Sequence, residues 1–149
     1  MPTEAPLLAG LDHIKLASSN IVTTSAFYVD ILGFTRIPEF DHRTPSGDLF
    51  AVICKHPSIP TMLEIRLNAE QATRHQTWDP VTWSVETRAD LEKWATWLAL
   101  KDVKCSKVLT ALRSWVLVAE DPDGRFVRFM TKETHEWTTE TSKDAYWLR

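Results

Sequence analysis

The chain has 149 residues, of which 44% are hydrophobic and 25% are charged, and its formal net charge is −3. This length suffices for one domain with a sizeable core, and the interspersed charges argue against a nucleic-acid or an anionic membrane partner. The sequence contains neither a run of about 18 apolar residues nor a signal-peptide pattern at its start, so we expect a cytoplasmic protein without a membrane segment. The two cysteines, Cys54 and Cys105, are expected to be free thiols.

The hydrophobic periodicity predicts the element order β-α-β-β-β, and this order occurs twice. In the first half, the predicted elements are a strand at 10–17, a helix at about 21–32 and strands at 34–40, 49–54 and 61–67. In the second half, they are a strand at 81–87, a helix at 88–101 and strands at 103–109, 114–120 and 126–130. Asn20 and its neighbours can cap the first helix, and Gly33 can end it.

Alternation along the opening strand separates two kinds of side chain. Ile14 and Leu16 share one face, while His13 and Lys15 lie on the other. If each helix covers one face of its sheet, the other face is free to line a cleft. The same alternation along the other predicted strands places four more residues on the cleft-lining face: Met62, Glu64, Arg66 and Arg128.

Four segments, at 11–14, 26–34, 62–65 and 121–129, together resemble the vicinal oxygen chelate superfamily. This group includes glyoxalase I, bleomycin-resistance proteins, fosfomycin-resistance enzymes and extradiol dioxygenases. The resemblance implies an α+β fold in which two tandem βαβββ modules form a curved mixed sheet that encloses a cleft. It implies a single domain with one module at about 10–68, a second at about 79–131 and a C-terminal tail at 132–149. It also implies a homodimer, because relatives commonly pair modules across a subunit interface.

The resemblance gives an incomplete metal site. Superfamily members that bind a divalent metal take ligands from the first and last strands of their modules, and His13 and Glu64 match two of these positions. In the second module the matching residues are Pro80, Thr82 and Arg128. Proline has no donor side chain, and a guanidinium repels a divalent cation. Catalytic zinc generally has three protein ligands, so no cofactor is favoured, and a metal held by His13 and Glu64 remains an alternative.

Three functions stay open. The first is an enzyme, a lyase or isomerase, in which His13 and Glu64 carry out metal-independent acid/base chemistry on a hydrophobic, oxygenated small molecule, aromatic or polyketide-like. The second is a metal-dependent lyase, isomerase or dioxygenase, and the third is a protein that sequesters a drug or metabolite. The expected substrate-binding residues are Lys15, Met62, Arg66, Trp78, Trp115 and Arg128. We interpret Trp83 as a core residue, and His42 and His56 as surface loop residues.

Overall fold

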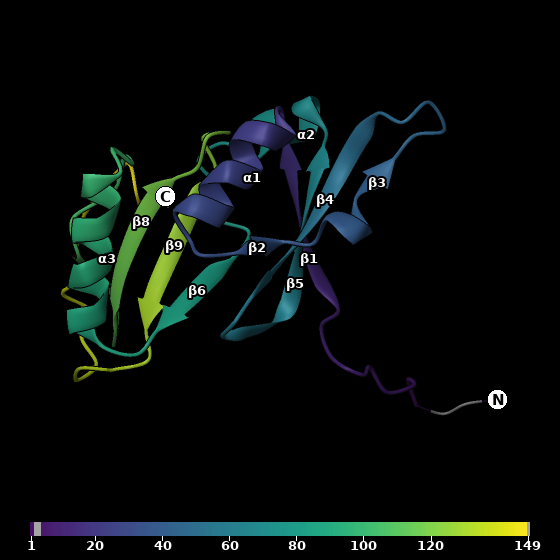
Figure 1. Ribbon diagram of the computed structural model, residues 1–149. Coiled ribbons are helices and arrows are strands. Elements are labelled where there is room, and N and C mark those ends of the chain that lie inside the picture. Colours follow the sequence, from purple (N-terminus) through teal and green to yellow (C-terminus); the bar gives the residue numbers. More distant parts are fainter. Residues whose placement is uncertain (2–3, 149) are drawn as a thin grey trace.

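The computed structural model describes residue 1 and residues 4–148, and both its strands and its helices are distributed along the chain (Figure 1). The strands are β1 (His13–Ser18), β2 (Thr35–Arg36), β3 (His42–Arg43), β4 (Leu49–His56), β5 (Ile59–Leu67), β6 (Thr82–Val85), β7 (Leu109–Thr110), β8 (Trp115–Glu120) and β9 (Phe126–Thr131). The helices are α1 (Ile21–Asp30), α2 (Ala69–Arg74) and α3 (Arg88–Leu100), and Pro38–Phe40 forms the 3-10 turn η1.

The strands form two mixed sheets. The first sheet has the order β1-β5-β4-β2, with β3 also paired to β4, and the second has the order β6-β9-β8-β7. In each sheet the opening strand pairs in parallel with a later one, β1 with β5 and β6 with β9, and the other pairs are antiparallel. The α+β class with two mixed, open and curved sheets is therefore confirmed.

Local sequence signals fix the ends of the two longer helices. The side chain of Asn20 accepts a hydrogen bond from the backbone N–H of Thr23 and so caps α1. After α1 the chain turns at Gly33, whose φ of 81° is a left-handed conformation that favours glycine. Thr87 and Asp90 form a reciprocal capping box at the start of α3.

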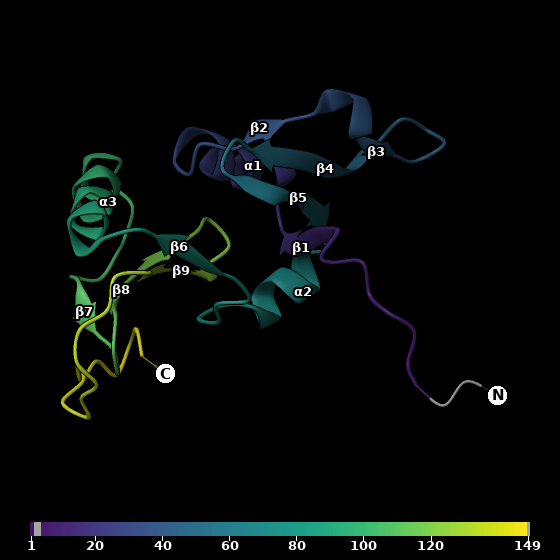
Figure 2. The same ribbon diagram turned by 90° about the horizontal axis from the view of Figure 1, so that it is seen from below.

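Helices α1 and α3 lie in the angle between the two sheets (Figure 2). The helix-facing sides of both sheets therefore contribute to one shared core, whose most deeply buried members include Leu16, Tyr28, Leu63, Ile65, Leu91, Leu98 and Leu117. The other face of each sheet is directed away from this core. As a result, the two uncovered faces do not oppose each other within one chain.

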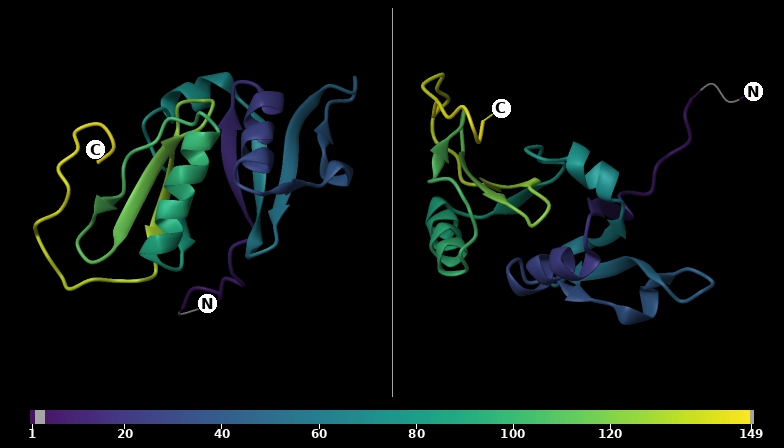
Figure 3. Two further views of the ribbon diagram at one scale, coloured as in Figure 1. Left: turned by 60° about the vertical axis from the view of Figure 1, so that its left-hand side comes forward. Right: turned by 90° about the horizontal axis from the view of Figure 1, so that it is seen from above.

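The C-terminal tail covers part of the second sheet's outer face. Trp147 is buried there against Val116, Val118 and Phe126, in a small cluster separate from the main core. The tail runs along the outside of β7 and β8 before it reaches this position (Figure 3). Among the described residues, no comparable segment covers the outer face of the first sheet.

A buried polar network joins the turn between β8 and β9 to the first sheet. Arg125 is 1% exposed, and its Nε donates a 2.9 Å hydrogen bond to Asp121. Its Nη1 donates to the carbonyl oxygen of Ala17 at 2.7 Å, and the hydroxyl of Tyr28 donates to Asp121 at 2.9 Å. This network ties the two sheets together through residues that are far apart in the sequence.

The structure corrects three predicted elements. The predicted strand at 34–40 is only the short β2 followed by η1, because Pro38 cannot donate a ladder hydrogen bond. The predicted strand at 103–109 is reduced to β7 and an isolated bridge between Cys105 and Ala119. The helix α2 was not predicted, because six residues are too few to show helical periodicity.

Candidate functional site

The uncovered face of the first sheet carries a buried carboxylate surrounded by cationic side chains. Glu64, on β5, has a side chain that is only 4% exposed. Lys15 Nζ lies 3.4 Å from its Oε2, and Arg66 Nε lies 3.2 Å from the same oxygen. His42 Nε2 lies 3.5 Å from Oε1. We call these four residues, Lys15, His42, Glu64 and Arg66, the Glu64 cluster.

Strand pairing explains why these residues meet. The parallel register of β1 and β5 sets Lys15 directly beside Glu64, and Arg66 follows Glu64 on the same face of β5. His42 arrives through β3, where it pairs with Ala51, which in turn pairs with Arg66. The interpretation of His42 as a surface loop residue is therefore wrong. A strand of two residues gives no periodic signal from which its position could have been predicted.

The Glu64 cluster leaves positive charge exposed to solvent. The side chains of Lys15 and Arg66 are 49% and 37% exposed, whereas Glu64 is covered. Glu64 Oε2 and Arg66 Nε are buried, and neither has a partner in hydrogen-bond geometry. One carboxylate thus faces two permanent cations and an imidazole. The outer sides of the cations remain free to bind an anionic oxygen.

His13 shares this face but does not contact the Glu64 cluster. It lies across from Met62, two residue pairs before Lys15 and Glu64. Its Nδ1 is 2.8 Å from Oδ2 of Asp12, so Asp12 is the carboxylate that orients this imidazole. No ion pair or hydrogen bond joins His13 to Glu64 in the described structure.

The remaining sequence-predicted residues lie elsewhere. Arg128, on the second sheet, pairs with Asp79 and donates a hydrogen bond to the carbonyl oxygen of Trp147. Trp78 is exposed in the loop before β6. Trp115, on β8, lies under the guanidinium of Arg88. Within one chain, the structure does not bring these three residues to the Glu64 cluster.

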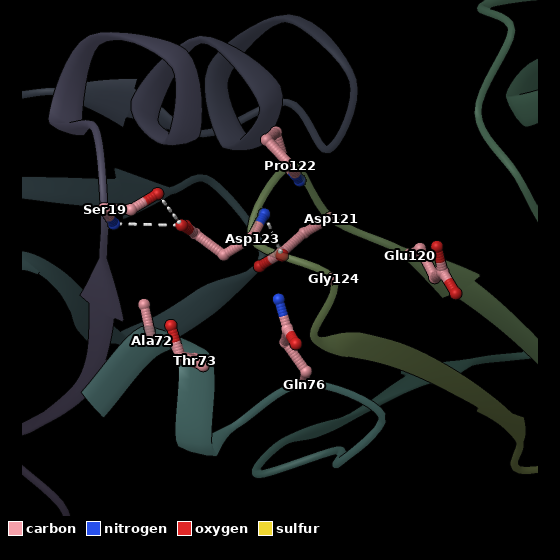
Figure 4. A pocket seen from close by; sticks show the side chains of 9 residues that line it. All are labelled: Ser19, Ala72, Thr73, Gln76, Glu120, Asp121, Pro122, Asp123 and Gly124. Atoms are coloured by element: carbon pink, nitrogen blue, oxygen red, sulfur yellow. Dashed lines mark hydrogen bonds between the residues drawn. The ribbon is translucent and has the colours of Figure 1, made fainter. Parts of the chain in front are cut away.

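A polar hollow of about 330 Å³ lies where α2 meets the turn between β8 and β9 (Figure 4). Asp123 lines it and accepts hydrogen bonds from Ser19 and Thr24. Burial alone would raise the pKa of Asp123, but these hydrogen bonds and the Arg125 charge lower it below its usual value. Because its carboxylates are already bonded within the protein, the hollow is part of the junction between the sheets.

The family model of the Glyoxalase/Bleomycin resistance protein/Dioxygenase superfamily matches residues 10–129. The chain belongs to this superfamily. A comparison with curated protein sequences gives no match.

Several solved superfamily structures share the fold at low sequence identity. A lactoylglutathione lyase from Agrobacterium tumefaciens is 14% identical with a TM-score of 0.64, over 85% of this chain and 96% of that one. The fosfomycin resistance protein FosX from Listeria monocytogenes is 12% identical with a TM-score of 0.67, over 84% and 94% of the two chains. An antibiotic binding protein from a Streptomyces species is 13% identical with a TM-score of 0.64, over 85% and 98%.

Other structures of the Listeria protein hold Mn(II), so we tested whether the residues of this superfamily member fit a metal. Among the residues that the structure describes, no three His, Cys, Asp or Glu side chains converge. Glu64, which by position would be a ligand, has its oxygens turned toward Lys15, Arg66 and His42. Two permanent cations at 3.2–3.4 Å would repel a divalent ion at this carboxylate. Within one chain, the donor set of the described residues does not fit a metal.

None of the described helices combines the length and the apolar character needed to cross a membrane.

Proposed function

We propose that the protein is an enzyme that carries out metal-independent acid/base chemistry on a hydrophobic, oxygenated small molecule. The observation that carries the proposal is the Glu64 cluster, in which a buried carboxylate holds Lys15 and Arg66 at 3.2–3.4 Å with their outer sides exposed. Such a site suits isomerisation, cyclisation, ring opening or elimination, because these reactions develop negative charge on a substrate oxygen. The superfamily's lyase and fosfomycin resistance members support a small-molecule role.

In this proposal, Lys15 and Arg66 bind the substrate oxygen as it becomes negatively charged. Their positions are fixed before the substrate binds, so little reorganisation is needed as the charge forms. Glu64 is a positioning residue, because it is covered and reaches the substrate only through the cations that it holds. The two cations thus supply the electrostatic stabilisation that a divalent metal supplies in other enzymes.

The proposed proton carrier is His13. Imidazole is the side chain best suited to gain and lose a proton near neutral pH. Asp12 Oδ2, 2.8 Å from Nδ1, orients the ring and leaves Nε2 available to the substrate. His42, the third neighbour of Glu64, is a second candidate for returning the proton.

We further propose a homodimer of single-domain chains, each with modules at about 10–68 and 79–131 and a tail at 132–149. The described part of the chain places no wall opposite the uncovered face of the first sheet, so a second copy would supply one. The exposed N-terminal segment also fits this arrangement, because Leu7 and Leu8 are 99% and 94% exposed. Exposed apolar side chains in such a segment are typical of a surface that another chain covers.

Proton transfer can be tested before the substrate is known. Metal-free protein in D₂O is incubated with a panel of ketones, β-keto acids and hydroxyaryl ketones, and deuterium incorporation next to the carbonyl is followed by ¹H NMR. We expect catalysed exchange that falls by about 10²-fold or more in His13→Asn and Lys15→Ala. Arg88→Ala, which removes an exposed cation on α3, is the control and leaves exchange unchanged. Exchange that is equal in all variants would place the chemistry elsewhere, and exchange that needs added Mn(II) would favour the metal-dependent alternative.

The separation of His13 from the Glu64 cluster favours a second candidate, a protein that sequesters a drug or metabolite. A site with cations but no base in contact with them can bind a ligand without transforming it. The Streptomyces structure with the same fold is an antibiotic binding protein. A ligand that quenches tryptophan fluorescence and is then recovered chemically unaltered would support this candidate over the enzyme.

A further inference from the structure

A second cavity lies between the two sheets, on the side that faces the helices. It has a volume of about 570 Å³, within the range of small-molecule pockets. It is separate from the Glu64 cluster, none of whose residues line it. The residues that define its chemistry are Ile14, Phe34, His56, Trp83, Trp94 and Phe129.

The cavity has aromatic walls from both sheets. The rings of Phe34 and Trp83 meet edge to face, with centroids 5.6 Å apart, and Trp94 stacks on Phe129 at 5.0 Å. Trp83 packs against the core, as the sequence predicts, but it also lines the cavity. Rings fixed in this way offer flat apolar surfaces to a ligand at little entropic cost.

His56 gives the cavity a hydrogen-bond donor. The interpretation of His56 as a surface loop residue is wrong, because it is the half-buried last residue of β4. The backbone N–H of Ser58 donates to its Nδ1 at 3.2 Å. The Nδ1 atom is therefore an acceptor, and the neutral ring carries its proton on Nε2. This Nε2–H has no hydrogen-bond partner among the described residues. It lies beside Gly33, where a Cβ added to the glycine would be 3.6 Å from Nε2.

We propose that this cavity binds a flat, neutral aromatic molecule that carries a carbonyl oxygen. The aromatic walls hold the ring system, and the Nε2–H of His56 donates to the carbonyl. The charged residues at the rim, Glu86 and Lys132, pair with each other at 2.6 Å and leave no net charge for an ionic ligand. The site is independent of the Glu64 cluster, so either can fail without the other.

The test uses 9-fluorenone and fluorene, which share a flat three-ring skeleton and differ in one carbonyl. Binding is followed through the indole N–H signals in ¹H–¹⁵N NMR spectra of the full chain. We expect saturable shifts of the Trp83 and Trp94 signals with 9-fluorenone, with a Kd on the order of 0.1 mM. Fluorene binds more weakly, because it leaves the His56 donor unpaired. Shifts confined to Trp78 or Trp147, or no saturable shift, would overturn the proposal.

Two variants locate the ligand. His56→Phe keeps a ring of similar size and should weaken 9-fluorenone binding by about fivefold, while fluorene binding stays unchanged. Thr61→Trp fills the cavity and should abolish binding of both compounds, whereas Thr96→Trp, on the exposed side of α3, leaves binding unchanged. Equal binding of 9-fluorenone by wild type and His56→Phe would refute the donor role. Full binding by a folded Thr61→Trp variant would refute the cavity itself. If only a protein lacking residues 1–9 binds the probe, a chain segment occupies the cavity and the proposal is wrong.

Discussion

Replacing Arg125 with Met should break the polar network that joins the two sheets. The guanidinium is 1% exposed and donates hydrogen bonds to Asp121 and to the carbonyl oxygen of Ala17. Methionine fills much of the same volume but leaves the Asp121 carboxylate buried beside it without its cation. The substitution therefore tests the charge pairing more than the packing.

The structure sets the size of the effect. Removing one partner of a buried ion pair costs about 3–5 kcal/mol, because the remaining charge is uncompensated. Asp121 keeps its hydrogen bonds from Tyr28 and from the backbone N–H of Asp123, so we expect the lower half of this range. That loss is a large fraction of the roughly 5–15 kcal/mol that stabilises a typical domain.

The assay is urea unfolding of Arg125→Met, Asp121→Asn and the double variant. We expect the double variant to be less destabilised than the sum of the single ones by about 1–3 kcal/mol, because it contains no unpaired charge. Additivity within about 0.5 kcal/mol would refute the reasoning. Burial raises the pKa of Asp121 while the Arg125 charge opposes this increase. In Arg125→Met this charge is absent, so Asp121 takes up a proton more readily in the folded state. The free energy of unfolding that the variant loses relative to wild type should therefore be smaller at about pH 4 than at pH 7.

Three further outcomes are expected. Burial raises the pKa of the Cys54 thiol to about 11, so iodoacetamide at about pH 8 should label it far more slowly in the folded protein than in urea, and equal rates would contradict its burial. Trp147→Ala uncovers Val116, Val118 and Phe126, so it should lower the free energy of unfolding by about 2–4 kcal/mol and increase the fluorescence of an added apolar dye. An unchanged urea midpoint would show that the tail is not docked. Deletion of residues 1–9, which include the exposed Leu7 and Leu8, should convert the proposed dimer to a monomer at micromolar concentration in light scattering. A dimer that survives the deletion would exclude this N-terminal segment from the interface.

Much of the fold follows from local signals in the sequence. Strict alternation in the opening strand places Leu16 in the core, and Asn20, Gly33 and the 87–90 capping box set helix ends. The mixed strand pairing agrees with what the family resemblance implies, and each sheet contains one parallel pair. The short elements α2 and β3 escaped prediction, and β2 was predicted too long, because these elements depend on tertiary packing and have too few residues for a periodic pattern.

Only part of the candidate site could be predicted from the sequence. Alternation alone places Lys15, Glu64 and Arg66 on one face, and the ion pairs among them confirm it. The neighbour of Glu64 on β1 depends on strand register, which a sequence does not specify, and the register selects Lys15 where His13 was expected. His42 reaches Glu64 only because the β3 strand folds back on β4.

The separation of Arg128 from the Glu64 cluster has a different origin. The alternation of side chains along a strand correctly identifies which residues lie on the uncovered face of each sheet. It carries no information about the angle between the sheets. Here α1 and α3 occupy that angle, so the two uncovered faces point apart (Figure 2). A site that uses both faces would therefore need a second copy of the chain.

The central claim is that Lys15 and Arg66, held by Glu64, bind an anionic oxygen without a metal. The most direct measurement is calorimetric titration of chelator-treated protein with benzoate, for wild type, Lys15→Ala, Arg66→Ala and the control Arg88→Ala. We predict saturable binding that each of the first two variants weakens about tenfold, as expected for the loss of a charge-assisted hydrogen bond, while Arg88→Ala binds like wild type. Binding that is equal in all four proteins, or that occurs only after Mn(II) is added, would contradict the account.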